Sequence, residues 1–263
     1  MKALVFLGGG RITSAMVAGL KLARYKAPII VHDRHPEKLR ELQRTSNVDV
    51  EPDLPRAVRQ AHILLIAVRP DSVEPLLEQI GEVKNPTLGV SLAAGIPLAK
   101  LRGRLGTQVR WARAMPSPVS RVGRGLTALT FDRGIPWPAQ REVSTLFAQV
   151  GQVIEIPEKQ FDGFTVTYSS SHGYHALATL AKAAAGTGLD RKTALLAAAH
   201  ALADGIQAWR ESGMSLENLL QEAATPGGIA ATVMDIMDAD GYAKTVERAL
   251  KAGLRRSQQN AKK

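Results

Sequence analysis

A glycine-rich turn lies between a short apolar run and the start of a helical pattern. The turn, Gly8-Gly9-Gly10, follows the apolar run Leu4–Leu7 and precedes an i, i+4 apolar stripe that begins at Ile12. Gly8 allows the chain to turn tightly, and Gly10 removes a Cβ where a diphosphate would approach the backbone. The next helix would present free N–H groups to that anion. This context predicts dinucleotide binding by Gly8, Gly10, Arg11 and Ile12.

The third position of this G-x-G-x-x-G/A pattern holds Thr13, where a smaller residue is usual. A purely structural tight turn is therefore the alternative interpretation of the motif. Asp33 lies 20 residues after Thr13, at the end of the second strand-like run, as the dinucleotide motif requires.

Asp33 and Arg34 bear on the choice of coenzyme. Asp33 can accept hydrogen bonds from both ribose hydroxyls, which favours NAD. Arg34 can pair with a 2′-phosphate, which favours NADP, because a guanidinium matches phosphate geometry. A surface Asp–Arg pair without a ligand is the third interpretation. We favour NADP over NAD.

Strand-like and helical patterns alternate through the first half of the chain. A continuous apolar run at residues 63–68 is typical of a strand buried on both faces of a parallel sheet. The alternation predicts a doubly wound, Rossmann-like α/β domain over residues 1–155. The expected strands are residues 2–7, 28–32, 63–68, 88–92, 109–112 and 126–131, and the expected helices are 12–22, 36–44 and 72–80.

From Ser171 onward the pattern is helical and rich in small side chains. Twelve alanines lie between Ala176 and Ala203, and two glycines, Gly186 and Gly188, divide the stretch into two helices. Alanine favours helix but buries little area, so a lone bundle of such helices would have a thin core. We therefore predict an all-helical domain over residues 156–263 that packs against a second copy of the chain, as a homodimer or a larger homo-oligomer.

Composition and charge narrow the classes of function. The 263 residues carry 34 basic and 24 acidic side chains, and the net charge of +10 raises the possibility of nucleic-acid binding. Aromatic residues make up only 5% of the chain and no nucleic-acid motif is present, so we expect no nucleic-acid partner. The absence of cysteine excludes thiolate chemistry and disulfides. No apolar stretch reaches the ~20 residues of a membrane span, and none resembles a signal peptide, so we expect a cytoplasmic protein.

Eight motifs, in order and spacing, resemble the pyrroline-5-carboxylate reductase family over nearly the whole chain. They are Gly8-x-Gly10, Ala67-Val68-Arg69-Pro70, Ser91-Leu92-Ala93-Ala94-Gly95-Ile96, Arg113-x-Met115-Pro116, Gly123-x-Gly125-x-Thr127-Ala128-Leu129, Val150-Gly151, Asp162 with Thr165, and Pro226-Gly227-Gly228.

The resemblance implies a nucleotide domain, a helical dimerisation domain and an active site at the dimer interface. It also implies hydride transfer from a nicotinamide coenzyme, usually NADPH, to the C=N carbon of 1-pyrroline-5-carboxylate, which yields L-proline. The matching motifs imply further coenzyme contacts from Ala67, Val68, Arg69, Pro70, Ala93, Ala94, Gly95, Met115 and Pro116.

The sequence departs from the family pattern where the substrate should bind. The family's Ser-Gly-Ser-Gly-Pro-Ala-Tyr is here Tyr168-Ser169-Ser170-Ser171-His172-Gly173-Tyr174, and its Pro-Gly-Gly-Thr-Thr ends in Ile229-Ala230. A family threonine that would bond the ring nitrogen aligns with Ala201, and Ser117 replaces an asparagine. The substrate-binding positions that the resemblance implies are Ser117, Ser169, Ser171, Gly227, Gly228, Ile229 and Ala230.

His172 and His175 lie three residues apart near this expected pocket. Either can protonate an imine nitrogen or bind a carboxylate, because histidine titrates near neutrality. An ordinary polar helix face is the more common use of such a pair, and no further ligand nearby supports a metal site. The catalytic candidates are His172, Tyr174 and Ser170.

Three hypotheses follow, in order of preference. The first is a pyrroline-5-carboxylate reductase, and the second is a reductase of a different cyclic imine, because the pocket motifs are altered. The third is a non-catalytic protein that binds a dinucleotide or a nucleic acid.

Overall fold

The structure, a computed structural model, describes residues 3–262 and divides into two compact units. The first unit runs to Val166 and also contains the segment that begins at Leu254, and the second is Thr167–Gly253. The first unit therefore extends beyond residue 155, where the sequence places the domain boundary, and it includes nearly all of helix α7 (Glu158–Thr167).

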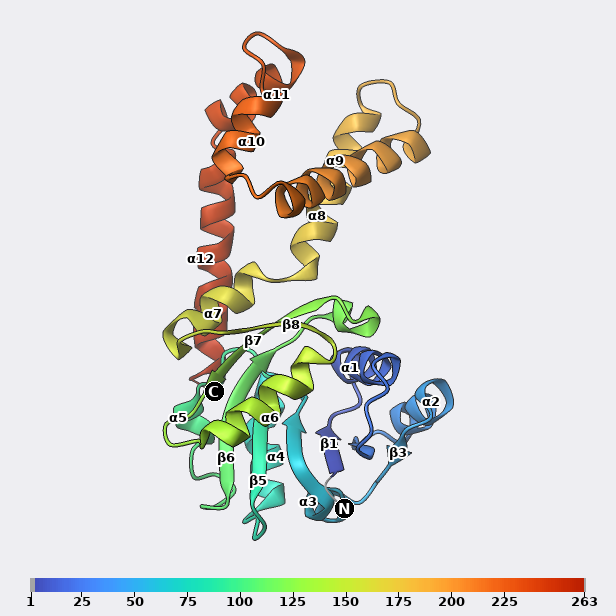
Figure 1. The fold of residues 1–263 in the computed structure, drawn as a ribbon, viewed down its shortest axis with the longest axis vertical. Coiled ribbons are helices and arrows are strands. Elements are labelled where there is room, and N and C mark those ends of the chain that lie inside the picture. Colours follow the sequence, from blue (N-terminus) through green and yellow to red (C-terminus); the bar gives the residue numbers. More distant parts are fainter. Residues whose placement is uncertain (1–2, 263) are drawn as a thin grey trace. The chain divides into compact units, whose positions relative to one another are not determined.

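Within the described residues, the first unit contains an eight-stranded sheet of order β3-β2-β1-β4-β5-β6-β7-β8 (Figure 1). The first six strands in this order are mutually parallel, whereas β7 pairs antiparallel with β6 and parallel with β8. The strands are β1 (Ala3–Leu7), β2 (Ile29–His32), β3 (Asp49–Val50), β4 (Ala61–Ile66), β5 (Thr87–Ser91), β6 (Val109–Met115), β7 (Gly125–Phe131) and β8 (Gly151–Glu155).

Two hydrophobic cores cover the two faces of this sheet, because successive residues of a strand point to opposite faces. In β1, Leu4 and Phe6 belong to one core and Val5 and Leu7 to the other. The first core contains α1 (Arg11–Leu22), α2 (Pro36–Ser46) and α6 (Trp137–Ala148), and the second contains α3 (Leu54–Gln60), α4 (Val73–Ile80) and α5 (Leu98–Leu101). The predicted doubly wound α/β class is confirmed.

Several strand boundaries differ from the predicted ones. β4 begins at Ala61 and ends at Ile66, so Ala67 and Val68 leave the strand and join the loop that follows it. β6 extends to Met115 because it pairs with β5 on one side and with β7 on the other. The sequence patterns also missed β3, β8, α3, α5, α6, α7 and α10 (Leu216–Ala223).

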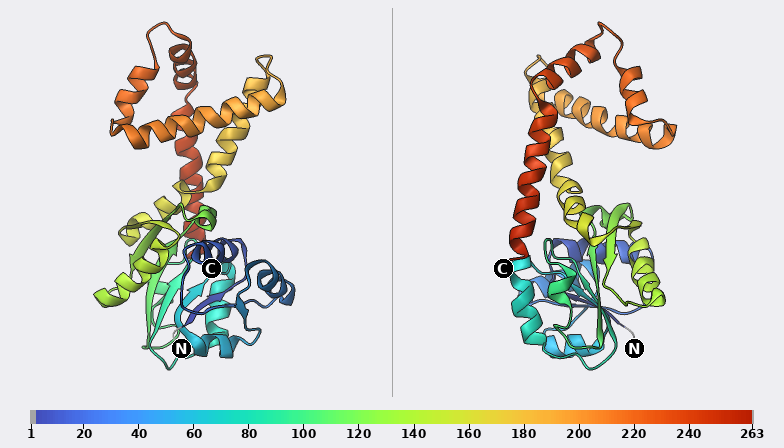
Figure 2. Two further views of the ribbon diagram at one scale, coloured as in Figure 1. Left: turned by 45° about the vertical axis from the view of Figure 1, so that its right-hand side comes forward. Right: turned by 90° about the vertical axis from the view of Figure 1, so that its left-hand side faces the viewer.

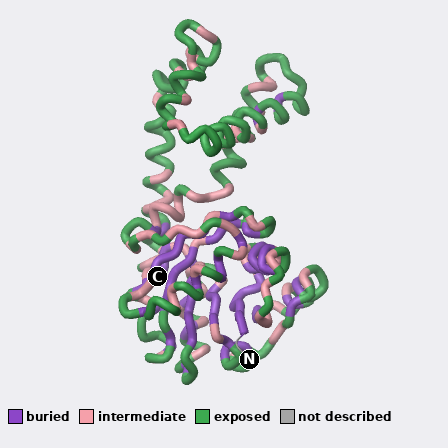
Figure 3. The backbone as a smooth tube through the Cα atoms, viewed as in Figure 1, coloured by how far each residue is buried: buried purple, intermediate pink, exposed green. Residues whose placement is uncertain are grey.

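The second unit consists of helices, as predicted. Its glycine-containing break lies between α8 (Ser170–Ala185) and α9 (Arg191–Ser212), which pack against each other. Only Ala194 and Ala198 are buried in residues 167–253, whereas strands β1, β2, β4 and β5 of the first unit are buried almost throughout (Figure 3). The helical unit of a single chain therefore has the small hydrophobic core that its alanine content predicts. The remaining helices are α10, α11 (Ile229–Ala239) and the first part of α12 (Tyr242–Asn260) (Figure 2).

None of the helices in residues 3–262 combines the length and the apolar character that a membrane span requires.

Candidate functional site

The carboxyl ends of five parallel strands lie together at one edge of the sheet. Leu7 pairs with His32 on one side and with Ile66 on the other, Ile66 pairs with Ser91, and Ser91 pairs with Arg113. The loops that follow these strands therefore meet at the same edge. In open α/β sheets such an edge, where the strand order changes direction at β1 and β4, is where ligands bind.

Gly8 makes the first turn out of β1 in a conformation that favours glycine. Its φ is +112°, and a Cβ there would lie 2.5 Å from the carbonyl oxygen of Ala67. Neighbouring strands fix this turn, because the Gly8 N–H donates to the His32 carbonyl at 2.7 Å and the Ala67 N–H donates to the Leu7 carbonyl at 2.8 Å. A side chain at Gly8 would therefore separate β1 from the loop after β4.

Gly10 has a different role, because the space that a side chain at this position would occupy is open. It precedes α1 with an ordinary φ of −82°, no atom lies within 4 Å of the position of a Cβ, and no side chain caps the helix. The first N–H groups of α1 thus face open space across a bare backbone. This arrangement suits a diphosphate, which would accept those hydrogen bonds and meet the positive end of the helix dipole.

Thr13 explains the departure from the usual dinucleotide motif. Its side chain is fully buried, and its hydroxyl donates a 2.5 Å hydrogen bond to the Gly8 carbonyl. The larger residue therefore braces the glycine turn from within the fold. The motif pattern does not predict this role, because it asks only for a small side chain at the third position.

Asp33 holds the same turn from the other side. The residue is 9% exposed, and its carboxylate accepts hydrogen bonds from the Gly9 N–H at 2.7 Å and from the His35 N–H at 2.9 Å. Lys38 lies 3.6 Å away. Burial alone would raise the pKa of Asp33, but the two backbone hydrogen bonds and the nearby positive charges outweigh burial and lower that pKa. Asp33 is therefore a structural clamp on the turn as well as a candidate ribose ligand.

Replacing Asp33 with asparagine is expected to lower the free energy of unfolding by about 2 kcal/mol at pH 7, because one backbone N–H loses a charged acceptor. The folded-state pKa lies below the unfolded value of about 3.9, so the carboxylate stabilises the fold above that pH and stops doing so as the pH falls through the folded pKa. Urea unfolding at pH 7 and from pH 5 to pH 3 should show the difference between the two proteins shrinking below about pH 4. The exposed Asp49→Asn is the matched control, and a constant difference across this range would contradict the assignment.

Positive side chains gather beside Asp33. Arg34 is exposed and its Nε lies 3.2 Å from the His35 ring, while Lys38 approaches Asp33 from the first turns of α2. Both cations lie next to the expected position of a coenzyme ribose. We did not predict Lys38 from the sequence, although its place two residues after the proline that begins α2 was a usable signal.

The other predicted coenzyme residues occupy the loops at the same edge. Ala67, Val68, Arg69 and Pro70 follow β4, and Ala93, Ala94 and Gly95 follow β5. Met115 ends β6, and Pro116 and Ser117 follow it into the short helix η2 (Pro118–Val122), where Ser117 Oγ accepts from the Val119 N–H. The structure therefore brings these positions to the edge that carries the glycine turn.

A buried arginine fastens this edge to α7. Arg113 is 2% exposed, and its guanidinium donates to Asp162 at 3.0 Å and to Glu158 at 3.3 Å. The guanidinium also lies 4.3 Å from the centre of the Phe161 ring, a cation–π contact. Glu158 in addition accepts a hydrogen bond from the Leu98 N–H at 2.7 Å, so it ties the start of α5 to the same cluster.

Apart from Ser117, the predicted substrate-binding and catalytic residues lie at two helix starts of the second unit. Ser169, Ser170, Ser171, His172 and Tyr174 lie at the start of α8, where the Ser169 and Ser171 hydroxyls hydrogen-bond each other at 2.7 Å. Gly227 and Gly228 precede α11, and Ile229 and Ala230 begin it. In one chain these two helix starts lie at opposite ends of the helical unit (Figures 1 and 2). A single chain does not bring them together.

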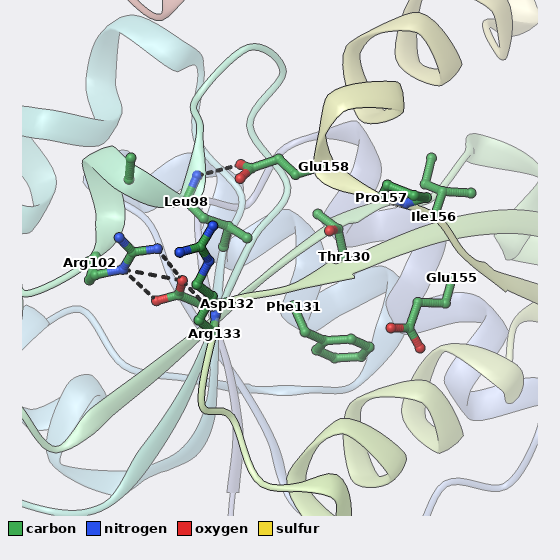
Figure 4. A pocket seen from close by; sticks show the side chains of 11 residues that line it. Leu98, Arg102, Thr130, Phe131, Asp132, Arg133, Glu155, Ile156, Pro157 and Glu158 are labelled. Carbon is green, nitrogen blue, oxygen red and sulfur yellow. Dashed lines mark hydrogen bonds and ion pairs between the residues drawn. The ribbon is translucent and has the colours of Figure 1, made fainter.

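One pocket of the first unit lies away from these residues. It has a volume of about 780 Å³ and lies at the carboxyl ends of β7 and β8, which run opposite to β1 (Figure 4). Arg102 donates to Asp132 at 3.0 Å in this pocket, and that hydrogen bond is the main cause that lowers the pKa of Asp132. None of the predicted site residues lines it.

Seven basic side chains lie in residues 100–124, and three of them form ion pairs within the protein. Arg102 pairs with Asp132, Arg104 with Glu74, and Arg113 with Glu158 and Asp162. These arginines are therefore poorly placed to bind nucleic-acid phosphates. In the described part of the chain, no three histidine, aspartate or glutamate side chains group as metal ligands do.

Two family models match the chain in succession. Residues 3–95 match a family described as NADP oxidoreductase coenzyme F420-dependent, and residues 158–260 match pyrroline-5-carboxylate reductase dimerisation.

Curated relatives cover the full length. A pyrroline-5-carboxylate reductase of Synechocystis sp. is 29% identical over 264 residues, which cover 99% of this chain and 98% of that protein. One of Mycobacterium tuberculosis is also 29% identical, over 98% of this chain and 97% of its own.

Solved structures share the fold. A pyrroline carboxylate reductase of Plasmodium falciparum with NADP bound has a TM-score of 0.87 at 21% identity, covering 99% of this chain and 98% of its own. The enzyme of Streptococcus pyogenes has a TM-score of 0.89 at 23% identity, covering 98% of both chains.

Proposed function

We propose that the chain is a member of the pyrroline-5-carboxylate reductase family and that it reduces 1-pyrroline-5-carboxylate to L-proline with NADPH. The observation that carries the proposal is the glycine turn. Gly8 makes a turn that only a residue without a side chain fits, and Gly10 leaves the start of α1 bare. The nearby Arg34 and Lys38 supply positive charge where a 2′-phosphate would lie.

The reaction depends more on how the protein positions the imine and the coenzyme than on reactive groups of the protein itself. The bound coenzyme supplies a hydride, two electrons with one proton, to the C=N carbon, and the protonated ring nitrogen keeps its proton. A protonated imine is already electrophilic, so the protein's tasks are to hold the imine carbon close to the coenzyme and to exclude water. In this proposal the loops after β4, β5 and β6 hold the coenzyme, and the residues at the starts of α8 and α11 bind the substrate.

A second copy of the chain completes the substrate site in this proposal. The α8 and α11 starts are separated in one chain, and Ile229 at the α11 start is 88% exposed. The helical unit also exposes many large apolar side chains, such as Leu196 and Ile236. Packing against a partner would bury these side chains and bring an α11 start of one subunit to an α8 start of the other. We therefore propose a dimer as the smallest active form.

Arg34→Ala is expected to raise the KM for NADPH about tenfold and to leave the KM for NADH nearly unchanged, because a charge-assisted bond to the 2′-phosphate is lost. Steady-state kinetics with both coenzymes measure this. Arg40→Ala is the matched control, because Arg40 is an exposed arginine on α2, the helix that begins two residues after Arg34. An equal loss with both coenzymes would remove Arg34 from coenzyme selection.

His172→Ala tests the proposed proton donor or carboxylate ligand. Because the imine is already activated when protonated, we expect a loss of about tenfold in kcat/KM for the imine, with the NADPH dissociation constant unchanged. His200→Ala, on α9 and hydrogen-bonded to Asp204, is the control. A rate equal to that of the unaltered protein would show that His172 neither donates a proton nor binds the carboxylate. The roles of Tyr174 and Ser170 would then be tested in the same way.

A reductase of another cyclic imine is the second candidate. The Ser169 and Ser171 hydroxyls bond each other at the helix start where the family has glycines, and Ile229 and Ala230 lack the hydroxyls of the family's threonines. The two serines narrow the start of α8, and Ile229 and Ala230 make the start of α11 less polar than the family pattern. Such a site favours a substrate with fewer polar groups than pyrroline carboxylate.

A steady-state assay with authentic 1-pyrroline-5-carboxylate and both nicotinamide coenzymes tests the proposal. NADPH oxidation that depends on the imine supports it. A panel of cyclic imines run alongside separates the two candidates, because the second requires a substrate with a clearly higher kcat/KM. Folded protein that turns over none of these imines would contradict both.

A further inference from the structure

The last turns of α12 contact the loop that follows β5. Residues from Leu254 onward belong to the first unit, where Ser257 is 5% exposed and Asn260 is partly buried. The loop contains Ala93, Ala94 and Gly95. Residues nearly 170 positions apart in the sequence thus meet at the sheet edge, although neither segment has a motif that signals the contact.

Two contacts define this junction. The Asn260 side-chain amide donates to the Ala94 carbonyl at 3.3 Å. Gly95 has a φ of +77°, and a Cβ there would collide with the carbonyl oxygen of Ser257. Gly95 therefore serves two purposes, a left-handed turn and a close approach between two backbones. This close approach explains the glycine without any ligand.

The contact lies in the middle of a loop whose two ends are already fastened. At its start, the Ala93 N–H donates to Ser91 Oγ at 3.3 Å. Beyond its end, the Leu98 N–H donates to Glu158 at 2.7 Å. α12 holds the segment between them, and in the proposed function that segment contacts the coenzyme.

We propose that the end of α12 positions the loop after β5 for coenzyme binding. Asn260 is the positioning residue, and the contact between Ser257 and Gly95 holds the loop against the helix. The inference rests on the proposed function for the identity of the ligand, NADPH. A loop held in its binding conformation loses less conformational entropy when the coenzyme binds, so the contact raises affinity without touching the ligand. By linkage, the bound coenzyme must stabilise the contact in return.

Asn260→Ala and Asn260→Asp test the side chain. Alanine removes the amide, whereas aspartate keeps its shape but cannot donate to the Ala94 carbonyl. We expect both to raise the NADPH dissociation constant, measured by the fluorescence of the reduced coenzyme, about fivefold, the effect of one lost hydrogen bond. Gln258→Ala, exposed in the same helical turn, should bind as the unaltered protein does. Gly95→Ala should weaken binding more than tenfold, because the φ and the contact are both lost.

The stabilisation of this contact by bound NADPH can be measured without an activity assay. Arg255 and Arg256 are exposed next to the contact, and Arg248 and Lys251 lie earlier on α12 in the second unit. NADPH should slow tryptic cleavage after Arg255 and Arg256, resolved by mass spectrometry, and this protection should be lost in Asn260→Ala.

The outcomes separate the inference from the proposed function. If NADPH binds but both Asn260 variants bind it within twofold of the Gln258→Ala control, the positioning role is wrong and the proposed function stands. If the unaltered, folded protein binds no nicotinamide coenzyme, the proposed function fails and the inference fails with it. Protection of Arg255 and Arg256 that persists in Asn260→Ala would also overturn the role of this side chain.

Discussion

Gly10→Ala is expected to raise the dissociation constant for NADPH about 100-fold while leaving the free energy of unfolding unchanged within error. No atom lies within 4 Å of the added methyl and the φ of −82° is ordinary, so the free protein accommodates alanine. The methyl would, however, stand where the diphosphate must approach the start of α1. A clash of about 3 kcal/mol corresponds to about 100-fold in affinity.

Coenzyme titration and urea unfolding on the same preparation measure both quantities. Gly163→Ala is the matched control, because Gly163 also has open space around it and lies in α7, away from the glycine turn. Gly8→Ala gives the contrasting result, a less stable protein, since its methyl would meet the Ala67 carbonyl. Unchanged coenzyme affinity in Gly10→Ala would mean that the diphosphate does not lie at this turn.

Arg113→Met is expected to lower the free energy of unfolding of the first unit by about 3 kcal/mol. The guanidinium is buried, and its loss leaves the Glu158 and Asp162 carboxylates side by side without a cation. Methionine keeps much of the length and packs against Phe161 but restores no hydrogen bond. Urea unfolding followed by tryptophan fluorescence suits this measurement, because Trp111 lies on the same strand as Arg113.

The carboxylates provide the internal control. Glu158→Gln with Asp162→Asn leaves a buried guanidinium without a counter-charge and should destabilise strongly, whereas adding both changes to Arg113→Met should recover part of the loss. Arg110→Met, on the same strand but exposed, should have little effect. Strictly additive losses in the triple variant would show that the three side chains do not act as one cluster.

The sequence predicted the fold where a pattern is local. The apolar run at residues 63–68 and the alanine-rich stretch after Ser171 each indicate their element without reference to the rest of the chain. The short strand β3 and the strand β8 have no such pattern, because their pairing with β2 and β7 decides their conformation. Likewise, Ala67 and Val68 look like strand residues, yet the turn beside Gly8 directs them away from the sheet.

The site was predicted in the same uneven way. Gly8, Gly10 and Asp33 follow from motif spacing, whereas the hydrogen bond of Thr13 to the Gly8 carbonyl depends on how the turn folds back on α1. The contact of Asn260 with Ala94 joins residues 166 positions apart and leaves no pattern in the sequence. The substrate side rests on the family resemblance, since a single chain leaves the starts of α8 and α11 apart.

The two hydrogen bonds that Asp33 accepts constrain any attempt to redesign the coenzyme preference of this protein. In many dehydrogenases the acidic residue after the second strand is the natural position to exchange. Here that exchange would remove a hydrogen-bond acceptor from the Gly9 and His35 N–H groups. The glycine turn would become less rigid at the same time as the coenzyme preference changed. A variant library for NADH use should therefore keep the aspartate fixed and vary Arg34 and Lys38, whose side chains bind no part of the scaffold backbone in the described structure.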